Sequence, residues 1–194
     1  MMDSKGKPLA VILAENLYED LELQYPRLRL MEAGFAVRVS GPEAGATYRS
    51  KHGYPVDTDA SFADIAPDEV DVLVVPGGYA PDKLRRHASC NQLVHDAFAA
   101  GAVIGFICHG GWVPISAGIV KGKRLTSVGA IRDDLVNAGA EWVDETCVTD
   151  GMLVTAQTPK DLPAFMRAIF TVLEGRGALE QQPAADRKFA PWSQ

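Results

Sequence analysis

The residues best suited to chemistry are a cysteine and a histidine that follow an apolar run. Val103 to Ile107 is a short hydrophobic segment, and it leads directly into Cys108-His109-Gly110-Gly111. Such a run is typical of a buried parallel strand, and the two glycines allow a sharp reversal and close packing of a helix. Cys108 would stand on that corner beside free helix N–H groups, which favour negative charge. We therefore expect a nucleophile elbow with Cys in place of Ser, and a thiol pKa below that of free cysteine.

Two other interpretations of Cys108 stand beside this one. A cysteine after an apolar strand is commonly just a small buried hydrophobe. A zinc site would need further ligands at close spacing, and the sequence has no C-x-x-C, no H-x-x-x-H and no close pair besides Cys108-His109. We therefore expect neither a metal nor a cofactor. Cys90 and Cys147 are interpreted as structural.

A pair of glycines follows another apolar strand. Asp71 to Val75 ends in Pro76-Gly77-Gly78. The pair can be a simple turn, or it can bring a bare N–H group close to Cys108. In the second case the N–H groups of Gly78 and His109 would form an oxyanion hole. It is not a phosphate-binding loop, because neither G-x-G-x-x-G nor a Walker pattern is present.

An acidic cluster opens the first predicted helix. Glu19, Asp20 and Glu22 can be favourable charges at a helix N-terminus, kept in solvent. Alternatively, one carboxyl group lies beside the thiol, donates a hydrogen bond to it and moves protons. The spacing alone does not select which acid would do so.

The elements that must position these groups alternate between strand and helix. Leu9 to Leu13 is a buried strand, and Phe35 to Ser40 is the next one. Between them a helix is indicated by apolar residues at helical spacing, namely Leu21, Tyr25, Leu28 and Met31. This alternation predicts an open α/β sheet with helices on both faces and an active site at the carboxyl ends of the strands. The loops after Leu13, Val75 and Ile107 all lie at such ends.

Composition sets the remaining limits. A length of 194 residues suits one domain, and the net charge of −6 gives no reason to expect nucleic acid or an anionic membrane as a partner. No apolar run approaches the roughly 20 residues that span a bilayer. The sparse, odd number of cysteines and the absence of a secretory signal predict a cytoplasmic protein with reduced thiols.

The ordered motifs resemble the PfpI-type intracellular protease and general stress protein family, within the superfamily of the parkinsonism-associated protein deglycase. The resemblance covers roughly Lys7 to Glu174 as a single domain, 7–174, and leaves 175–194 as a polar tail. The matching motifs are Glu19-Asp20-x-Glu22 with Tyr25-Pro26, Lys51-His52-Gly53, Pro76-Gly77-Gly78, Cys108-His109-Gly110, Ser116-Ala117-Gly118, Asp133-Asp134 and Asn137 to Asp144.

The resemblance implies a flavodoxin-like three-layer α/β sandwich of the class I glutamine amidotransferase type, with a parallel central sheet. It implies that Cys108 is the nucleophile and that Glu22 is the acid hydrogen-bonded to it. It further implies that His109 is the histidine of a Cys-His pair and that the Gly78 N–H completes the oxyanion hole. Glu19 matches an acid near the site and the subunit contact.

One position departs from the family pattern. Archaeal members carry a Glu after Pro-Gly-Gly that reaches the histidine of a neighbouring subunit and completes a triad in a hexamer. Asp82 occupies that position here and is one methylene shorter. A homodimer is therefore the expected assembly, with a hexamer as the alternative.

The resemblance implies three possible functions. The leading hypothesis is a cytoplasmic stress-protection enzyme, a glyoxalase or protein deglycase, whose Cys108 attacks small carbonyl compounds or modified proteins and peptides. The second is a cysteine peptidase or amidase that uses Cys108-His109 with Asp82 from a neighbouring subunit. The third is a non-enzymatic redox sensor in which Cys108 is oxidised. All three use Cys108 and Glu22, so the sequence does not separate them.

Overall fold

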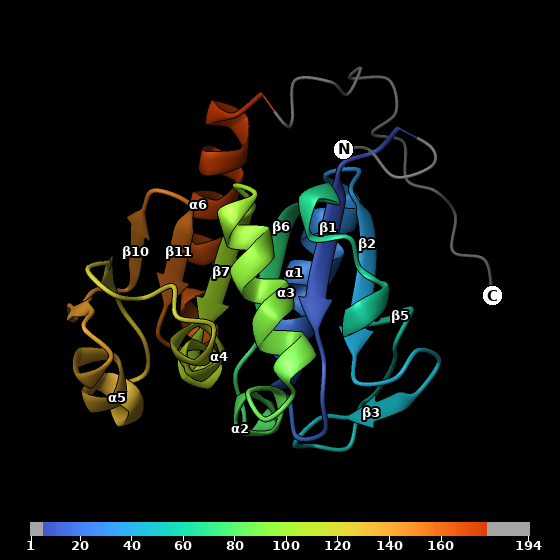
Figure 1. Ribbon diagram of the computed structural model, residues 1–194, viewed down its shortest axis with the longest axis horizontal. Helices are drawn as coiled ribbons and strands as arrows, with labels where there is room; N and C mark the ends of the chain where they lie inside the picture. The colour runs from blue at the N-terminus through green and yellow to red at the C-terminus, as the bar shows by residue number, and fades with distance from the viewer. Residues whose placement is uncertain (1–5, 178–194) are drawn as a thin grey trace.

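A seven-stranded sheet forms the centre of the protein (Figure 1). The structure is a computed structural model that describes residues 6–177, so most of the tail expected over 175–194 lies outside the described residues. The order of strands in the sheet is β10-β11-β7-β6-β1-β2-β5. In chain order the strands are β1 (Leu9–Leu13), β2 (Ala36–Gly41), β3 (Thr47–Arg49), β4 (Pro55–Asp57), β5 (Ala60–Ser61), β6 (Val70–Val75), β7 (Val103–Ile107), β8 (Arg124–Leu125), β9 (Glu141–Trp142), β10 (Cys147–Asp150) and β11 (Leu153–Ala156).

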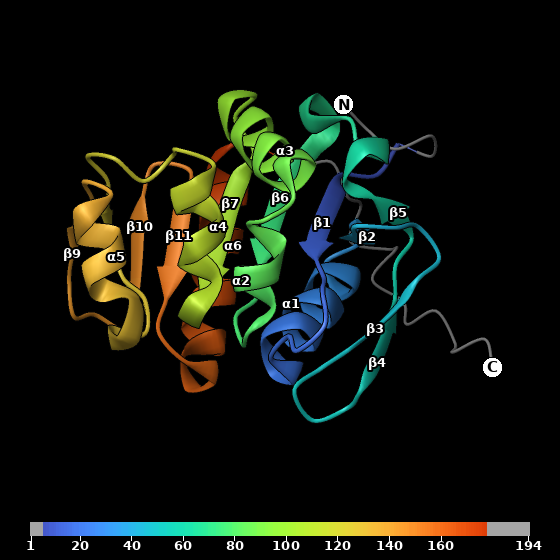
Figure 2. The same ribbon diagram turned by 60° about the horizontal axis from the view of Figure 1, so that its bottom comes forward.

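Helices cover both faces of this sheet, as expected (Figures 1 and 2). α1 and α6 contact each other and pack on one face, while α3 packs on the other face with α4 and α2 beside it. The helices are α1 (Asp20–Glu32), α2 (Ala80–Leu84), α3 (Ala88–Ala99), α4 (Trp112–Ser116), α5 (Arg132–Asn137) and α6 (Leu162–Gly175). The result is the three-layer α/β sandwich predicted from the sequence.

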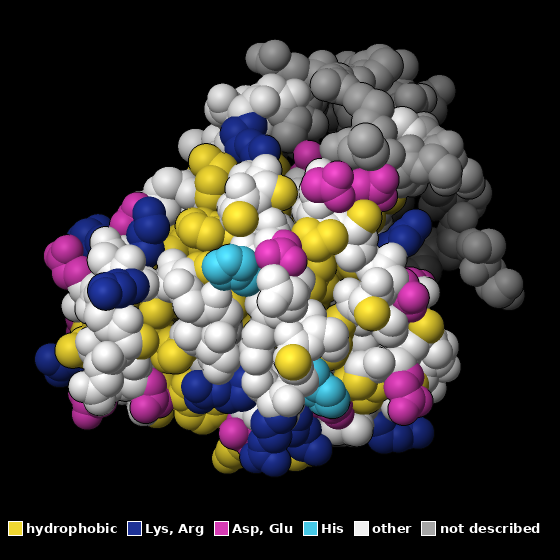
Figure 3. Space-filling model, viewed as in Figure 1, with side chains coloured by type: hydrophobic (Ala, Val, Ile, Leu, Met, Phe, Trp, Pro, Cys, Tyr) yellow, Lys and Arg dark blue, Asp and Glu magenta, His cyan; other side chains and the backbone are white. Residues whose placement is uncertain are grey.

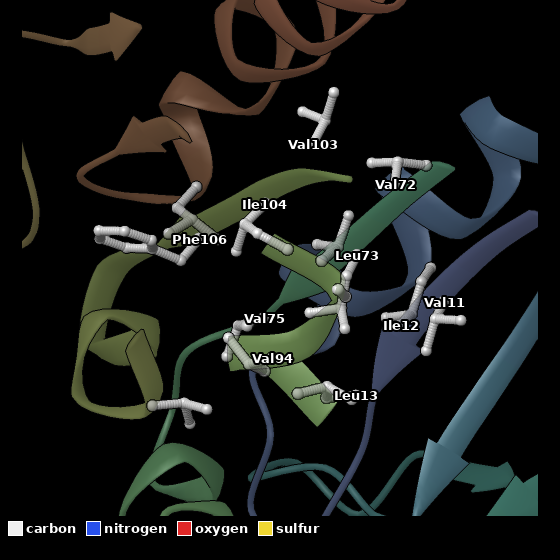
Figure 4. Close-up of a cluster of buried hydrophobic side chains, with 14 of the residues drawn as sticks. Val11, Ile12, Leu13, Val72, Leu73, Val75, Val94, Val103, Ile104 and Phe106 are labelled. Atoms are coloured by element: carbon white, nitrogen blue, oxygen red, sulfur yellow. The ribbon is translucent and has the colours of Figure 1, made fainter. Parts of the chain in front are cut away.

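The hydrophobic core lies between the sheet and these helices. Every residue of β1 and β7 is buried, which explains why both strands read as continuous apolar runs. Figure 4 shows their side chains packed with those of β6 and with Val94 of α3. This packing fixes the carboxyl ends of the three adjacent strands β7, β6 and β1, from which the candidate site is built.

The sheet is parallel except at one edge. β10 pairs antiparallel with β11, whereas the other pairings within the sheet are parallel. The reason is the tight turn after Asp150, where Gly151 adopts φ +60° and returns the chain at once. The expected parallel central sheet is therefore present, with one antiparallel strand at its edge.

The first helix forms where predicted, but the apolar residues that indicated it are mostly exposed. Leu21, Leu28 and Met31 have relative exposures of 57%, 49% and 51%. The face of α1 that packs inward instead carries Leu23, Leu30, Pro26 and Glu22. The buried face thus contains a carboxyl group that the apolar periodicity did not reveal.

A small hairpin, β3–β4, lies beyond the sheet on the side of β1 and β2 (Figure 2). Its turn is tied back to the loop after β1, because Ser50 bridges to Tyr18 and the Lys51 N–H donates to the Tyr18 carbonyl. The hairpin therefore borders the loop that begins α1. Within residues 6–177, no helix has both the length and the apolar character needed to cross a membrane.

Candidate active site

Three loops meet at the carboxyl ends of β7, β6 and β1, and Cys108 lies where they converge. Cys108 directly follows β7 and has φ +60°, a left-handed conformation that is uncommon for a non-glycine residue. The reversal lies at the cysteine itself, whereas we expected the glycines after it to allow it. Gly110 provides the expected close packing, since a Cβ on it would lie 2.4 Å from the Val75 carbonyl oxygen. Strain of this kind is concentrated at functional sites.

Two backbone N–H groups are directed at the Cys108 sulfur. They belong to Gly78 and His109, the two donors that the sequence suggested for an oxyanion hole. Gly78 has φ +79°, and a Cβ there would lie 2.4 Å from the Leu17 carbonyl oxygen. That carbonyl also accepts a hydrogen bond of 2.9 Å from the Tyr79 N–H, which holds the loop after β6 against the loop after β1. Only glycine fits this position without strain.

Glu22 is the acid that lies beside the thiol. Its side chain is completely buried, and its Oε2 accepts a 2.7 Å hydrogen bond from the Gly77 N–H. Burial, reinforced by the charge of Glu19, raises the pKa of Glu22 to about 7. The carboxyl group also interacts with the Cys108 thiol, although its Oε1 has no fully formed hydrogen bond. Near neutral pH this carboxyl group can therefore both give and take a proton.

The thiol does not have the lowered pKa that we expected from the elbow. Burial, followed by the negative charge of Glu22, raises the pKa of Cys108 to about 12. The N–H groups of His109 and Gly78 act in the opposite direction and favour the thiolate. The expectation considered only the N–H groups and omitted the burial of the thiol and the charge of Glu22. As a result, Cys108 and Glu22 resist ionising together.

His109 also reaches the sulfur. Its Nδ1 lies 3.3 Å from Cys108 Sγ, although the two residues are adjacent in the chain. Burial, and then the positive charge of Lys51, lower the pKa of His109 below its usual value. The imidazole is therefore neutral at pH 7 and can accept a proton.

Glu19 and Lys51 form the edge of the site. Glu19 is buried and is the N-cap of α1, because its Oε2 accepts a 2.9 Å hydrogen bond from the Glu22 N–H. Its Oε1 lies 3.6 Å from Lys51 Nζ. The charge of Lys51 lowers the pKa of both Glu22 and His109. We had not placed Lys51 in the site, and the signal that could have indicated it is its position in the motif Lys51-His52-Gly53.

Asp82 lies apart from this group within the protomer. It is in α2, and its carboxylate forms an ion pair with Arg86. Lys and Arg side chains gather over α2 at the edge of the face shown in Figure 3. A role for Asp82 at the histidine of a neighbouring subunit stays a prediction.

The described residues contain no group of three or more His, Cys, Asp or Glu side chains arranged to hold a metal ion. Cys90 is fully buried in the core, and burial raises its thiol pKa to about 12. Cys147 is half-buried in the edge strand β10, and burial raises its thiol pKa to about 11. Neither lies in the loops that form the candidate site.

The chain is similar to known proteins. A family model described as the DJ-1/PfpI family matches residues 8–172. The chain belongs to the DJ-1/PfpI family. It is 42% identical over 164 residues to a protein of Pyrococcus furiosus named deglycase PfpI, covering 84% of this chain and 98% of that one. A protein of Thermococcus kodakarensis named deglycase TK1284 is 43% identical over 163 residues, with the same coverage of both chains.

Solved structures of the DJ-1/PfpI family have the same fold. Drosophila melanogaster DJ-1beta superposes with a TM-score of 0.81 at 28% identity and covers 90% of this chain and 95% of its own. A two-domain protein of Anabaena variabilis, with a DJ-1/ThiJ/PfpI-like and a ferritin-like domain, gives a TM-score of 0.84 at 37% identity. That match covers 86% of this chain and 50% of the two-domain protein, so this chain spans half of its length.

Proposed function

We propose that this chain is a cysteine-dependent glyoxalase or protein deglycase that acts on reactive carbonyls, as small compounds or as adducts on proteins and peptides. The observation that carries the proposal is the convergence of four groups on one strained cysteine. The Cys108 sulfur is met by the N–H groups of Gly78 and His109, the Glu22 carboxyl group and the His109 imidazole. The names of the relatives in Pyrococcus furiosus and Thermococcus kodakarensis, both called deglycases, support this reaction class.

The chemistry that this geometry supports can be written for methylglyoxal. The Cys108 sulfur attacks the aldehyde carbon, a C–S bond forms, and the carbonyl oxygen takes a proton to give a hemithioacetal. The N–H groups of Gly78 and His109 lie beside the sulfur, where they can donate to the developing oxyanion. A base then moves a proton from the first carbon to the second, which gives a thioester of lactate. Water hydrolyses the thioester, so the sum is methylglyoxal plus water giving lactate.

Two groups can move these protons. Glu22 has a pKa near 7, so it is able to act as acid and base at neutral pH. His109 is neutral at pH 7 and reaches the sulfur with Nδ1. Glu22 is the buried and fixed group of the two, which suits it to the proton transfer on carbon, whereas His109 is suited to deprotonating the thiol.

The test is the formation of lactate from methylglyoxal by the wild type and by the Cys108→Ser variant. The variant should lose at least about a hundredfold in rate, because the nucleophile itself is removed. Cys147→Ser is the matched control and should keep the wild-type rate, since this thiol lies in β10 and outside the site. Full turnover by Cys108→Ser would refute the proposal.

The other two hypotheses are the alternative outcomes of the same experiment. If no protein forms lactate, peptide hydrolysis that disappears on dilution and with Asp82→Ala would indicate a peptidase built between subunits. Selective oxidation of Cys108 by mild peroxide, ahead of Cys90 and Cys147 and without turnover, would indicate a redox sensor.

A further inference from the structure

An indole ring lies against the histidine of the candidate site. The rings of His109 and Trp112 have centroids 5.2 Å apart and are inclined by 54°. Trp112 is the first residue of α4, and its Nε1–H donates a 2.7 Å hydrogen bond to Asp134 Oδ2 in α5. A chain of contacts therefore runs from α5 through Trp112 to His109 and ends at the Cys108 sulfur.

The position of the His109 ring at the sulfur needs support from other side chains. His109 follows Cys108 directly in the chain, so the backbone alone does not bring its ring to the sulfur. The position of the ring depends on two side-chain torsion angles. The ring is only half-buried, and its Nδ1 nevertheless lies 3.3 Å from Sγ. A tilted aromatic pair at about 5 Å is a favourable arrangement and restricts both rings. The hydrogen bond to Asp134 in turn fixes the orientation of the Trp112 indole.

We propose that Trp112, held by Asp134, is a positioning residue that keeps His109 Nδ1 on the Cys108 sulfur, so that the Cys-His pair is complete within one protomer. The proton-transfer role of His109 rests on the proposed function, but its position does not. Asp134 thus orients the histidine through an indole of the same chain. Asp82, which was expected to orient the histidine of a neighbouring subunit, is paired with Arg86 in the same chain.

The groups that face the imidazole come from three places in the fold. Cys108 lies beside it, Lys51 acts on it from the turn between β3 and β4, and Trp112 covers it from α4. Loss of the indole would uncover the imidazole and leave Cys108 and Lys51 in place. Because burial is the larger cause of the lowered His109 pKa, that pKa should rise toward 6.5 when the cover is removed.

Two measurements on the full chain test the proposal without any substrate. The first is the rate at which iodoacetamide alkylates Cys108 at pH 7, followed by the mass of the peptide that contains Cys108. The second is the titration of the His109 ring by NMR, assigned with a His109→Gln variant. Trp112→Ala should slow the alkylation about tenfold, since Nδ1 then no longer receives the thiol proton, and should raise the His109 pKa.

Matched variants separate positioning from a general loss of structure. Trp112→Phe keeps a ring against His109 and should stay within about threefold of the wild-type alkylation rate. Trp142→Phe removes another indole N–H, one that donates to Ser127 Oγ at 3.0 Å and does not touch His109, so both readouts should match the wild type. Asp134→Ala alters only an exposed side chain and should slow alkylation about threefold.

Wild-type alkylation and an unchanged His109 titration in Trp112→Ala would overturn the proposal. If Trp112→Ala does not fold, Asp134→Ala decides, and wild-type alkylation in that variant has the same meaning. A wild type that forms no lactate would instead remove the proposed function and leave this result intact, because neither measurement requires turnover.

Discussion

Replacing Glu22 with Gln is expected to stabilise the protein at alkaline pH and to leave its stability in acid almost unchanged. The carboxyl group is fully buried, and its pKa is raised from 4.5 to about 7. A raised pKa means that the folded state favours the protonated acid. The contribution of Glu22 to the free energy of unfolding is fully present below pH 4.5 and is lost as the pH rises through about 7. A shift of about 2.5 units at about 1.4 kcal/mol each gives a loss of about 3 kcal/mol.

Gln cannot ionise, so the variant does not lose this unfolding free energy as the pH rises. Its amide oxygen can still accept the hydrogen bond from the Gly77 N–H, and its volume matches the protonated acid. The difference in unfolding free energy between Glu22→Gln and wild type should therefore grow by about 2–3 kcal/mol between about pH 4.5 and about pH 8.5. Urea denaturation of both proteins at the two pH values measures it. Titrating groups that do not interact with Glu22 are common to both proteins and cancel in the difference.

The matched control is Glu32→Gln in the same helix. Glu32 is exposed and pairs with Arg29, so this variant should show no gain in stability at alkaline pH. A difference between Glu22→Gln and wild type that stays constant within about 0.5 kcal/mol across the pH range would refute the reasoning. It would mean that the folded protein holds Glu22 ionised at no energetic disadvantage.

Two further predictions concern the support of the site. Gly77→Ala should lower the unfolding free energy by at least about 2 kcal/mol, since its Cβ would lie 2.6 Å from Glu22 Oε2 and 2.8 Å from Cys108 Cβ; thermal unfolding measures this. Asp20→Asn should destabilise by about 1–2 kcal/mol at pH 7. Burial raises the Asp20 pKa, but hydrogen bonds from Ser50 and His52 outweigh it and lower that pKa, so the difference should disappear as the pH falls below about 4.

The sheet could be predicted from the sequence because its central strands are buried on both faces and read as uninterrupted apolar runs. Leu9 to Leu13 and Val103 to Ile107 are such runs, and the structure forms β1 and β7 over the same bounds. The orientation of α1 could not be predicted, because helical periodicity does not say which face is buried. Leu21 and Leu28 fit the period and are exposed, while Glu22 is buried because Gly77 and Cys108 face it from neighbouring loops.

The candidate site, too, could be predicted from the sequence only in part. Apolar runs that end in Cys108 and Gly78 placed both residues at adjacent strand ends, since parallel strands align their carboxyl ends. The pKa of Cys108 and the role of Trp112 depend on side chains that are far apart in sequence, and no local pattern encodes them. Trp112 meets Asp134 across 22 positions of the chain, and the bond forms only after α4 and α5 have packed.

The raised pKa of the thiol is compatible with a nucleophile once Cys108 and Glu22 are treated as a pair. One proton leaves the pair near pH 7 and the second only near pH 12, and the two arrangements with one proton carry the same net charge. With one proton left, the pair exchanges between a Glu22 carboxylate with a thiol and a protonated Glu22 with a thiolate, and the two N–H groups on the sulfur stabilise the second arrangement. Alkylation of Cys108 should therefore rise near pH 7. A rise confined to pH values near 12 would show that the remaining proton stays on sulfur.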